Sequence, residues 1–420
     1  MKRIIFIILS FSTLLLSGQS LIEVPKDAAN LSAAVQLSQP GDTILLQPGI
    51  YTDSVHISNT NLIFRGDPNG GSILSPGANG KSFVVSNATV EFENLIFDDF
   101  EQNTPFPNGA IFADYSDIKI NQCQFLDMGT AVSILWGNLE FSNSVVKNSR
   151  GVGILQNGGE FLVYNSLLYG LDKTVFSTNR AHGYFFNNTI IGSTPNRNRA
   201  VVINSDSISH FFNNIIQGFG IAIQLLASDS TELQALRIYN NNVFANLRPY
   251  SYEYNESLSL PIFSGALVPN PGTGELRVWS DFQDTTNFDF SLKYSSPCTD
   301  AGSNNYPFPV SVDLDSKPRL IGQAPDIGAL ENQGSLSYPS KEGVEVLRVF
   351  PNPNKGAFTL ILPMTIKGEV EVLNTAGKHI KSINVNGQSE VFCDLVLKPG
   401  LYYLRWSGEN TSGVHKVLIK

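Results

Sequence analysis

The feature that most constrains this chain is a short phrase of alternating apolar residues that ends in an amide and recurs between Val90 and Phe244. Successive copies read VEFENLIF, IKINQCQF, LEFSNSVV, FLVYNSLL, YFFNNTII, HFFNNIIQ and LRIYNNNV. Aligned on one amide per copy, they step by about 28, 21, 22, 23, 26 and 26 residues. A period of this length means that one supersecondary unit is stacked many times. The aligned amides are Asn94, Gln122, Asn143, Asn165, Asn188, Asn214 and Asn240.

Each repeat has room for three short strands and none for a helix. Apolar residues alternate within the phrase, which is strand geometry with one face turned inward. A second apolar run follows the amide, and a third, such as Val152–Leu155, precedes the next phrase. We therefore expect an all-β fold of stacked coils with three parallel sheets. The pattern resembles the right-handed parallel β-helix of the pectin-lyase-like superfamily, and the resemblance covers Leu21 to Glu331.

The repeated amide has a structural explanation. The bend between two strands favours residues that tolerate a left-handed backbone, and Asn is one of them. Stacked amides can also hydrogen-bond along the column, and each such bond contributes roughly 0.5–1.5 kcal/mol. We assign these asparagines to the fold and not to catalysis.

Composition and the N-terminus indicate export. Charged residues make up 15% of the chain and the net charge is −9, which argues against nucleic-acid binding. Residues 1–18 carry Lys2 and Arg3 before an apolar run, which is typical of a cleavable signal peptide. We place cleavage near Gly18, and we expect no transmembrane segment and a monomer.

The cysteines and histidines offer no metal site. The three cysteines, Cys123, Cys298 and Cys393, are far apart, which favours neither a disulfide framework nor a zinc site. The five histidines have no ligand spacing. We expect no cofactor, with calcium as the one alternative discussed below.

The chain divides into several parts. Residues 19–264 are expected to form the parallel β-helix, with a capping helix over Asn30–Ser38 that blunts the exposed sheet edge. Residues 265–331 resemble the segment that closes such helices in surface-anchored bacterial proteins, through SPCTDAG at Ser296 and DIGALE at Asp326. Its carboxylates could bind Ca²⁺, or they could cap turns and pair with Arg319, which we favour. The calcium candidates are Asp313, Asp315 and Asp326.

The C-terminal region predicts a separate domain. Residues 332–343 are polar and predict a linker, and residues 344–420 hold about seven short alternating runs at the spacing of a small Ig-like β-sandwich. The motifs of this region resemble the C-terminal sorting domain of the type IX secretion system, which implies that its machinery is a partner and that the protein is secreted or displayed on the cell surface. The residues that carry the resemblance are Pro351, Asn352, Pro353, Gly356, Gly400, Tyr402, Lys416 and Lys420.

No catalytic constellation is evident in the sequence. On the runs that precede each phrase, the residues expected to point outward include no carboxylate pair and no base, although a one-residue error in register would exchange the two faces. We therefore expect a secreted or surface β-helix that binds polysaccharide without evident catalytic machinery. The alternative is a polysaccharide lyase or glycoside hydrolase acting on an acidic glycan.

One group of residues is a candidate binding site. Arg150, Lys173 and Arg199 stand before corresponding strands on three successive coils, which stack at about 4.8 Å. Such a column could bind an anionic chain, or these could be solvated loop residues at one rim, which we favour. The side chains expected nearby are Trp136, Phe176 and Asn179.

Overall fold

The computed structural model describes most of the chain as two compact units, Met1–Gln333 and Gly334–Lys420. The predicted signal peptide, residues 1–18, lies outside the described residues. These are 19–76, 83–100, 109–171, 173–192, 198–204, 207–227, 236–244, 246, 248–254, 274–334, 347–350, 354–362, 367–375, 377–386, 388, 390–407 and 412–420.

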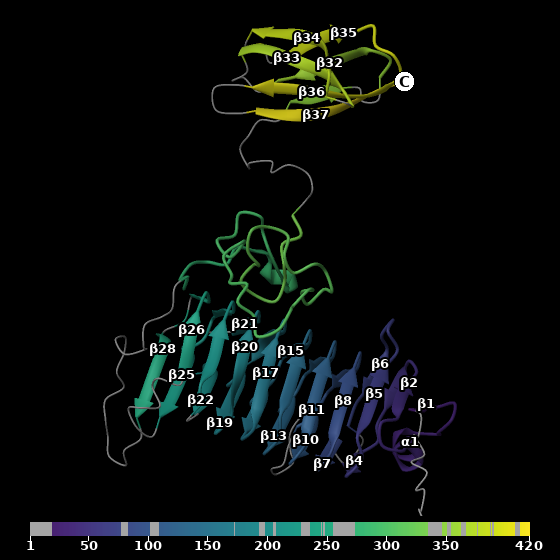
Figure 1. Cartoon of the computed structure of the whole chain (residues 1–420), viewed down its shortest axis with the longest axis vertical. Helices are drawn as coiled ribbons and strands as arrows, with labels where there is room; N and C mark the ends of the chain where they lie inside the picture. The colour runs from purple at the N-terminus through teal and green to yellow at the C-terminus, as the bar shows by residue number, and fades with distance from the viewer. Residues whose placement is uncertain are drawn as a thin grey trace, which may run out of the picture. The chain divides into compact units, whose positions relative to one another are not determined.

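Three parallel sheets build the first unit (Figure 1). Sheet A contains β1 (Leu21–Val24), β2 (Thr43–Leu46), β5 (Leu62–Gly66), β8 (Thr89–Glu93), β11 (Asp117–Asn121), β14 (Leu139–Ser142), β17 (Glu160–Tyr164), β20 (His182–Phe186), β23 (Ser209–Phe212) and β26 (Leu236–Tyr239). Sheet B contains β3 (Gly49–Tyr51), β6 (Ser72–Leu74), β9 (Ile96–Asp98), β12 (Gln124–Leu126), β15 (Val145–Lys147), β18 (Leu167–Leu171), β21 (Thr189–Gly192), β24 (Ile215–Gln217) and β27 (Asn242–Phe244). Sheet C contains β4 (Val55–Ser58), β7 (Phe83–Ser86), β10 (Ile111–Asp114), β13 (Val132–Leu135), β16 (Ile154–Asn157), β19 (Phe176–Asn179), β22 (Arg199–Asn204), β25 (Ile221–Ala227) and β28 (Arg248–Tyr254).

From β2 onward each coil contributes one strand to each sheet, and every strand pairs with the coils before and after it. The alternation seen in the sequence points one set of apolar side chains inward, where they form a single continuous core. Phenylalanines stack from coil to coil inside it, as Phe97 and Phe125 do with ring centroids 4.6 Å apart. The predicted fold class, an all-β chain with a parallel β-helix followed by a small β-sandwich, is confirmed.

The predicted capping helix is present as α1 (Leu31–Leu37). Asn30 caps it, since its Oδ1 accepts a hydrogen bond of 2.8 Å from the amide of Ala33. Leu31 and Ala34 are buried against the first coil. Within the described part of the chain, no helix is long and apolar enough to cross a bilayer.

The amide column occupies the bend between sheets A and B, and its backbone is left-handed as expected. Its φ angles range from 48° to 55°. Two members differ from the predicted alignment: the left-handed residues are Asn187 and Asn213, whereas Asn188 and Asn214 come one position later and point inward. The reason is that three consecutive coils carry paired asparagines, and the sequence pattern alone does not say which of the two makes the bend. The members with positive φ are Asn94, Gln122, Asn143, Asn165, Asn187, Asn213 and Asn240.

The inward-pointing asparagines form a second, buried ladder. The Asn214 Oδ1 accepts hydrogen bonds from the main-chain amide and side-chain Nδ2 of Asn188, at 3.0 and 3.1 Å. Its own Nδ2 donates to the carbonyl of Phe185 and to Oδ1 of Asn241, both at 2.9 Å. The ladder satisfies polar groups that lie inside the bend and away from water.

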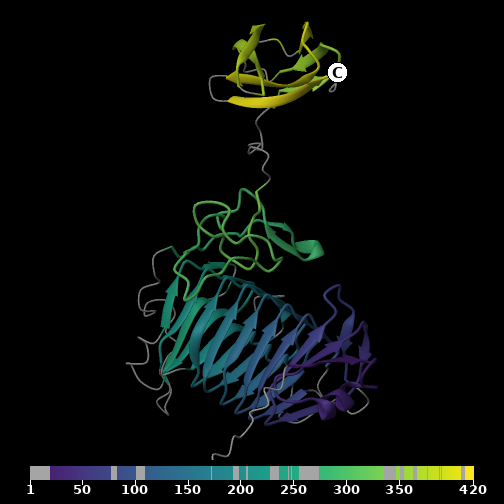
Figure 2. The same ribbon diagram turned by 45° about the vertical axis from the view of Figure 1, so that its right-hand side comes forward.

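The closing segment docks on the outward-facing amide column. The Nδ2 atoms of Asn165 and Asn213 donate to the carbonyls of Val312 and Ser303, at 2.7 and 2.9 Å. The Asn240 Nδ2 donates to the carbonyl of Ala301 at 3.1 Å. Figures 1 and 2 both show this segment (green) lying along the edge where the strands of sheet A end. Its regular elements are β29 (Phe282–Asp284), the 3-10 helix η2 (Thr285–Asn287) and β30 (Asp289–Leu292).

Aromatic rings stack on the same edge. Tyr164, Phe186, Phe212 and Tyr239 occupy one register position on four coils, and successive ring planes are within 5° of parallel at 4.8–5.2 Å. Tyr306 of the closing segment packs against two of these rings, at 5.6 and 6.0 Å. This stack and the amide column together fix the closing segment along the coils.

The described residues of the second unit form seven strands, as predicted, in two antiparallel sheets around a core of their own. One sheet has the order β31-β32-β35 and the other β34-β33-β36-β37. Their bounds are β31 (Arg348–Phe350), β32 (Ala357–Ile361), β33 (Lys367–Asn374), β34 (His379–Asn386), β35 (Glu390–Asp394), β36 (Gly400–Ser407) and β37 (Ser412–Ile419).

We predict that Asn214→Ala lowers the free energy of unfolding of the first unit by about 3 kcal/mol, because four buried hydrogen bonds lose their partner. Asn204→Ala is the matched control, since Asn204 bonds Asn179 at the surface and should cost less than about 1 kcal/mol. Urea unfolding of the two variants measures the difference. Equal losses would show that the buried ladder is not a main source of stability.

Candidate functional site

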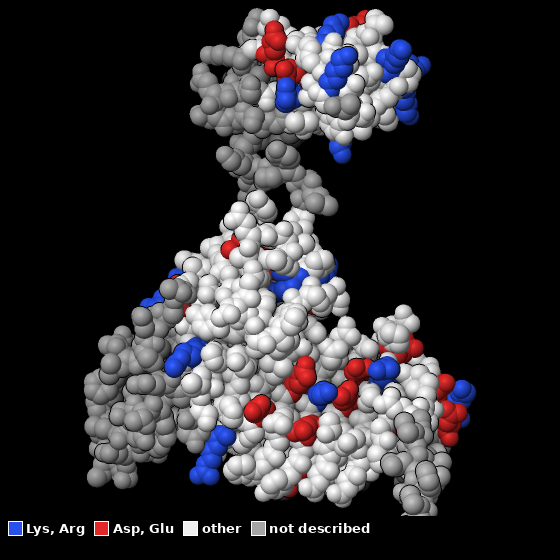
Figure 3. All heavy atoms as spheres, in the orientation of Figure 1, with Lys and Arg blue, Asp and Glu red and all other residues white. Residues whose placement is uncertain are grey.

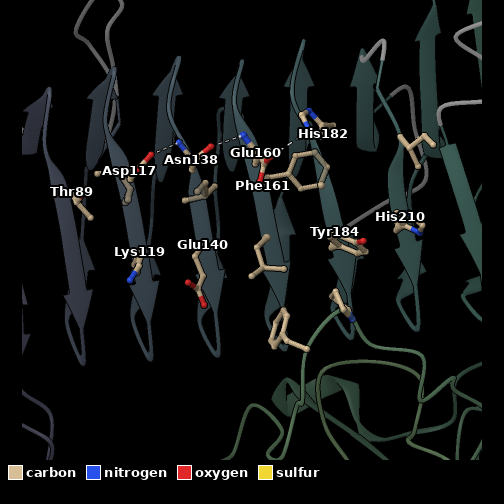
Figure 4. Close-up of a pocket in the computed structure, with 17 residues that line it drawn as sticks. Thr89, Asp117, Lys119, Asn138, Glu140, Glu160, Phe161, His182, Tyr184 and His210 are labelled. Atoms are coloured by element: carbon tan, nitrogen blue, oxygen red, sulfur yellow. Dashed lines mark hydrogen bonds and ion pairs between the residues drawn. The ribbon is translucent and has the colours of Figure 1, made fainter.

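A groove of about 710 Å³ runs across the outer face of sheet A, over β11, β14, β17, β20 and β23. Two rows of outward side chains form its base, and each row takes one residue from each coil (Figure 4). The first row is Thr89, Asp117, Asn138, Glu160 and His182. The second is Lys119, Glu140, Leu162, Tyr184 and His210.

The first row is linked from coil to coil. The Asp117 Oδ1 accepts a hydrogen bond of 3.0 Å from the amide of Asn138, whose own Oδ1 accepts one of 2.9 Å from the amide of Glu160. The Glu160 Oε1 lies 3.7 Å from Nε2 of His182. These contacts hold the polar side chains in a line across the strands, as Figure 4 shows.

The second row changes character along the groove. At one end the Lys119 Nζ is 2.9 Å from Oε1 of Glu91, so its ammonium is held in an ion pair. Glu140 comes next and accepts a hydrogen bond of 3.2 Å from the hydroxyl of Tyr164. At the other end the rings of Tyr184 and His210 stack at 4.8 Å. Charge therefore gives way to aromatic surface.

The closing segment supplies a wall of this groove through Pro307 and Phe308. Phe308 packs edge-on against Tyr164 and Phe186 of the aromatic stack, with ring centroids 5.3 and 5.9 Å away. The amide column that docks this segment therefore also shapes the groove.

A second cavity of about 480 Å³ adjoins the groove and shares Thr89, Asp117 and Asn138 with it. Tyr115 and Trp136 line it from neighbouring coils, and both are exposed. Each has a left-handed backbone, with φ of 47° and 54°, at the bend between sheets C and A. The indole of Trp136 lies close over Gly158, where a Cβ atom would come within 2.4 Å of the ring. Glycine at this position lets the indole lie against the next coil.

Burial alters the ionisation of two side chains of this face. Burial, and then the charge of Arg237, lowers the pKa of His210, so its imidazole is neutral at pH 7. Burial raises the pKa of Tyr164 to about 12, so its hydroxyl stays protonated and donates to Glu140. A neutral His210 brings no positive charge to offset the carboxylates of the groove.

The structure separates the residues that the sequence grouped together. Trp136 and Asn179 lie at the ends of sheet C strands, whereas Arg150, Lys173 and Arg199 lie at or before their starts. A strand of four residues spans about 13 Å, so the two sets do not form one cluster. Of the predicted ligand-binding residues, Trp136 is the one that borders the groove region.

Phe176 is not a binding residue. Its side chain is fully buried and packs against Phe161 and Phe185, with ring centroids 5.0 Å away in both cases. The prediction that Phe176 belongs to the binding site beside the basic residues requires an outward side chain and was wrong, because Phe176 pairs with the inward-pointing Ile154. Val175 before it is also buried, so the alternation breaks down at this strand.

The three basic residues do not share a register position either. Strand pairing aligns Ile154 with Phe176 and Phe176 with Val201, which places Arg150 four residues, Lys173 three and Arg199 two before the aligned positions. Unequal lengths of the preceding connections cause this offset. Binding of an anionic chain by these residues stays a prediction, but the three side chains do not form one column along the coils.

The groove residues of sheet A were missed because only the sheet C face was considered for a site. The sequence does contain a sign of this site, because one outward position of the repeated phrases is polar or aromatic on five of the coils. Aligning the phrases on the left-handed amides, which are Asn94, Gln122, Asn143, Asn187 and Asn213, places these positions in one row, three residues before each amide. These outward residues are Glu91, Lys119, Glu140, Tyr184 and His210, and all of them except Glu91 line the groove.

The calcium candidates are occupied by hydrogen bonds within the closing segment. The Asp313 Oδ1 accepts from the amides of Asp315 and Lys317, and its Oδ2 accepts from the amide of Glu331. Asp315 pairs with Lys317 at 2.9 Å, and Asp326 accepts from the amides of Asp300 and Asn332. In the described ranges, no group of three or more His, Cys, Asp or Glu side chains is placed to hold a metal ion. These contacts fit the turn-capping alternative.

Buried charge is concentrated at Arg319. Its Nη2 donates to the carbonyls of Asp326 and Gly328, at 2.8 and 2.6 Å, and its Nε lies 3.8 Å from Oε2 of Glu331. Burial, and then the charge of Asp326, raises the pKa of Glu331 to about 7. Burial likewise raises the pKa of Asp326. The segment therefore holds protons that the unfolded chain would release.

The sorting-motif residues lie in the second unit, although Pro351, Asn352 and Pro353 are outside the described residues. Gly356 has φ of 101° and lies so close to the carbonyl of Leu395 that a Cβ atom would come within 2.3 Å of that oxygen. Gly400 starts β36, and the Tyr402 hydroxyl donates to the carbonyl of Lys398 at 3.0 Å. Lys416 is exposed on β37. The Lys420 amide donates to the carbonyl of Asn354, which ties the C-terminus to the start of the domain.

Two solved structures illustrate what the chain is similar to. The PL6 family alginate lyase AlyGC is 12% identical, with a TM-score of 0.35, and the match covers 62% of this chain and 39% of the lyase. The pectate lyase Pel9A is also 12% identical, with a TM-score of 0.37, and the match covers 75% of this chain and 97% of that lyase. Neither likeness carries an activity over to this chain. No curated protein matches the chain.

The C-terminal unit has a family match of its own. Residues 348–420 match the family described as the secretion system C-terminal sorting domain. This confirms the sorting domain inferred from the sequence motifs. The chain is therefore exported through type IX secretion, to the cell surface or the medium.

We predict that the first unit becomes less stable as the pH rises from about 4.5 to about 7. The folded pKa of Glu331 lies above its ordinary value of 4.5, so the folded state binds more protons in this window and loses that advantage as the pH rises. Thermal unfolding between pH 4.5 and 8 measures the slope. In Glu331→Gln the slope should be smaller, and in the exposed control Glu160→Gln it should be unchanged. An unaltered slope in Glu331→Gln would contradict this assignment.

Proposed function

We propose that this protein is a surface or secreted glycan-binding protein that holds a carbohydrate chain in the groove over sheet A. The observation that carries the proposal is the groove itself, in which polar rows, aromatic rings and an apolar wall converge on one open face. Ligand sites are concave and mostly apolar, with a few placed polar groups. Export through the sorting domain supports a role outside the cell.

The side chains suit a sugar. Amide and carboxylate oxygens at Asp117, Asn138 and Glu140 can accept hydrogen bonds from hydroxyl groups. Exposed rings at Tyr115 and Trp136 offer flat apolar surface on which a sugar ring can stack. Because the rows repeat at the coil spacing of about 4.8 Å, side chains are available to successive sugar units along the groove, first charged ones and then aromatic ones.

Hydrolysis is a second candidate function, favoured by the placement of carboxylates in the groove. Asp117 and Glu140 lie on adjacent strands and two residues apart in register, which puts their Cα atoms about 8 Å apart. Glycosidases use a pair of carboxyl groups that flank the scissile bond, and two acidic side chains on neighbouring strands of one face can flank a sugar bound across them. New reducing ends released from a glycan by the wild type and not by Glu140→Gln would establish hydrolysis, whereas binding without product supports the primary proposal.

We predict that Trp136→Ala weakens glycan binding by about tenfold or more, because a ring that stacks on a ligand contributes on the order of 1–2 kcal/mol. Titration calorimetry or affinity electrophoresis of the full-length protein measures the loss. Trp279→Ala is the matched control, since Trp279 is 50% exposed against 47% for Trp136 and does not line the groove. If both variants lose the same affinity for the glycan, or if Trp136→Ala loses none, the glycan does not bind against Trp136.

We predict that a chain ending at Gln333 stays in the periplasm of a host with type IX secretion, because it lacks the sorting domain. Fractionation and immunoblotting measure its distribution. The full-length Glu140→Gln variant is the control and should be exported like the wild type. Equal amounts of the truncated and full-length chains in the medium would refute the routing.

A further inference from the structure

We propose that the groove selects a glycan without acidic groups, and that it binds such a chain most tightly when the sugars carry protonated amino groups. This proposal rests on the proposed function, and it adds the class of glycan that the groove binds. Its basis is the charge of the groove together with the apolar side chains and rings that line the groove beside the charged ones.

Carboxylates dominate the charge of the lining. Asp117, Glu140 and Glu160 face the groove, and Lys119 is the one ammonium among its described lining residues. That ammonium is already paired with Glu91, 2.9 Å away. Three carboxylates against one ammonium give the acidic and basic side chains of the lining a combined charge of −2. Figure 3 shows acidic side chains gathered on this face of the molecule.

The two neighbouring bases, Arg65 and Arg237, do not reverse this balance. Arg65, the outward base of β5, is also held, since its Nε lies 2.6 Å from Oε2 of Glu93. Arg237, which aligns with His210 at the other end of the second row, lies outside the lining of the groove. A polyuronate would bring carboxylates against carboxylates and lose affinity, whereas an ammonium would meet opposite charge.

The rest of the groove fixes the ligand as a glycan chain rather than a small cation. Leu162, Tyr184 and Ile208 from successive coils, with Phe308 opposite, form an apolar surface that continues past the acidic part. Beyond the shared residues Thr89, Asp117 and Asn138, the second cavity adds Tyr115 and Trp136. The acidic groups thus lie between two aromatic regions, which suits a chain several sugars long with amino groups over Asp117 and Glu140.

The test compares three hexasaccharides on the full-length protein: one of glucosamine, one of N-acetylglucosamine and one of a uronic acid. We expect the glucosamine chain to bind roughly tenfold more tightly than the neutral chain, since two or three exposed charge contacts each give a few-fold. The uronic acid chain should bind most weakly. Raising the salt toward 1 M should remove the advantage of the glucosamine chain and leave the neutral chain unaffected.

The variant Asp117→Asn with Glu140→Gln should lose the preference for glucosamine while still binding the neutral chain. Asp98→Asn, on sheet B away from the groove, is the control and should keep the preference. Tightest binding of the uronic acid chain, or an unchanged preference in the double variant, overturns this inference and leaves the proposed function standing. Binding of none of the three chains overturns both.

Discussion

The amide column at the bend between sheets A and B is the interaction on which the rest of the structure depends. On seven successive coils a left-handed amide residue makes this bend, and asparagine suits the position while leaving a side chain that can hydrogen-bond outward. The outward amides bind the closing segment through Val312, Ser303 and Ala301. That segment then places Pro307 and Phe308 beside sheet A. One local backbone requirement therefore leads, through a docking contact, to the wall of the groove.

Much of the fold could be predicted because its cause is local and repeats. The alternation of apolar residues predicts the strands, and the spacing of the repeated phrases predicts the coils. Asn30 predicts the N-terminal cap of α1. The docking of the closing segment could not be predicted, because its hydrogen bonds join residues up to 194 positions apart in the chain, such as Gln122 and Ser316. Nothing in the local sequence specifies such a pairing.

The candidate site was harder to predict than the fold for a related reason. A groove requires knowing which side chains point outward and what stands beside them. At Phe176 the alternation fails, since Val175 and Phe176 are both buried, and a one-residue error turns a core ring into a supposed ligand contact. Trp136 was identified from its chemistry, but its partners Tyr115 and Asp117 come from the preceding coil and were not. The structure also changes the expected ligand from an acidic glycan to a neutral or amino glycan. The basic residues do not form one column, and the groove lining is acidic.

The most direct measurement is a crystal structure of the full-length protein with a bound glucosamine oligosaccharide. The account predicts a chain lying across the strands of sheet A, from Trp136 past Asp117 and Glu140 to the wall at Phe308. Its amino groups should contact the two carboxylates. A chain bound instead on sheet C near Arg150 and Lys173, or on the C-terminal domain, would contradict the central claim that the docked closing segment builds the binding groove.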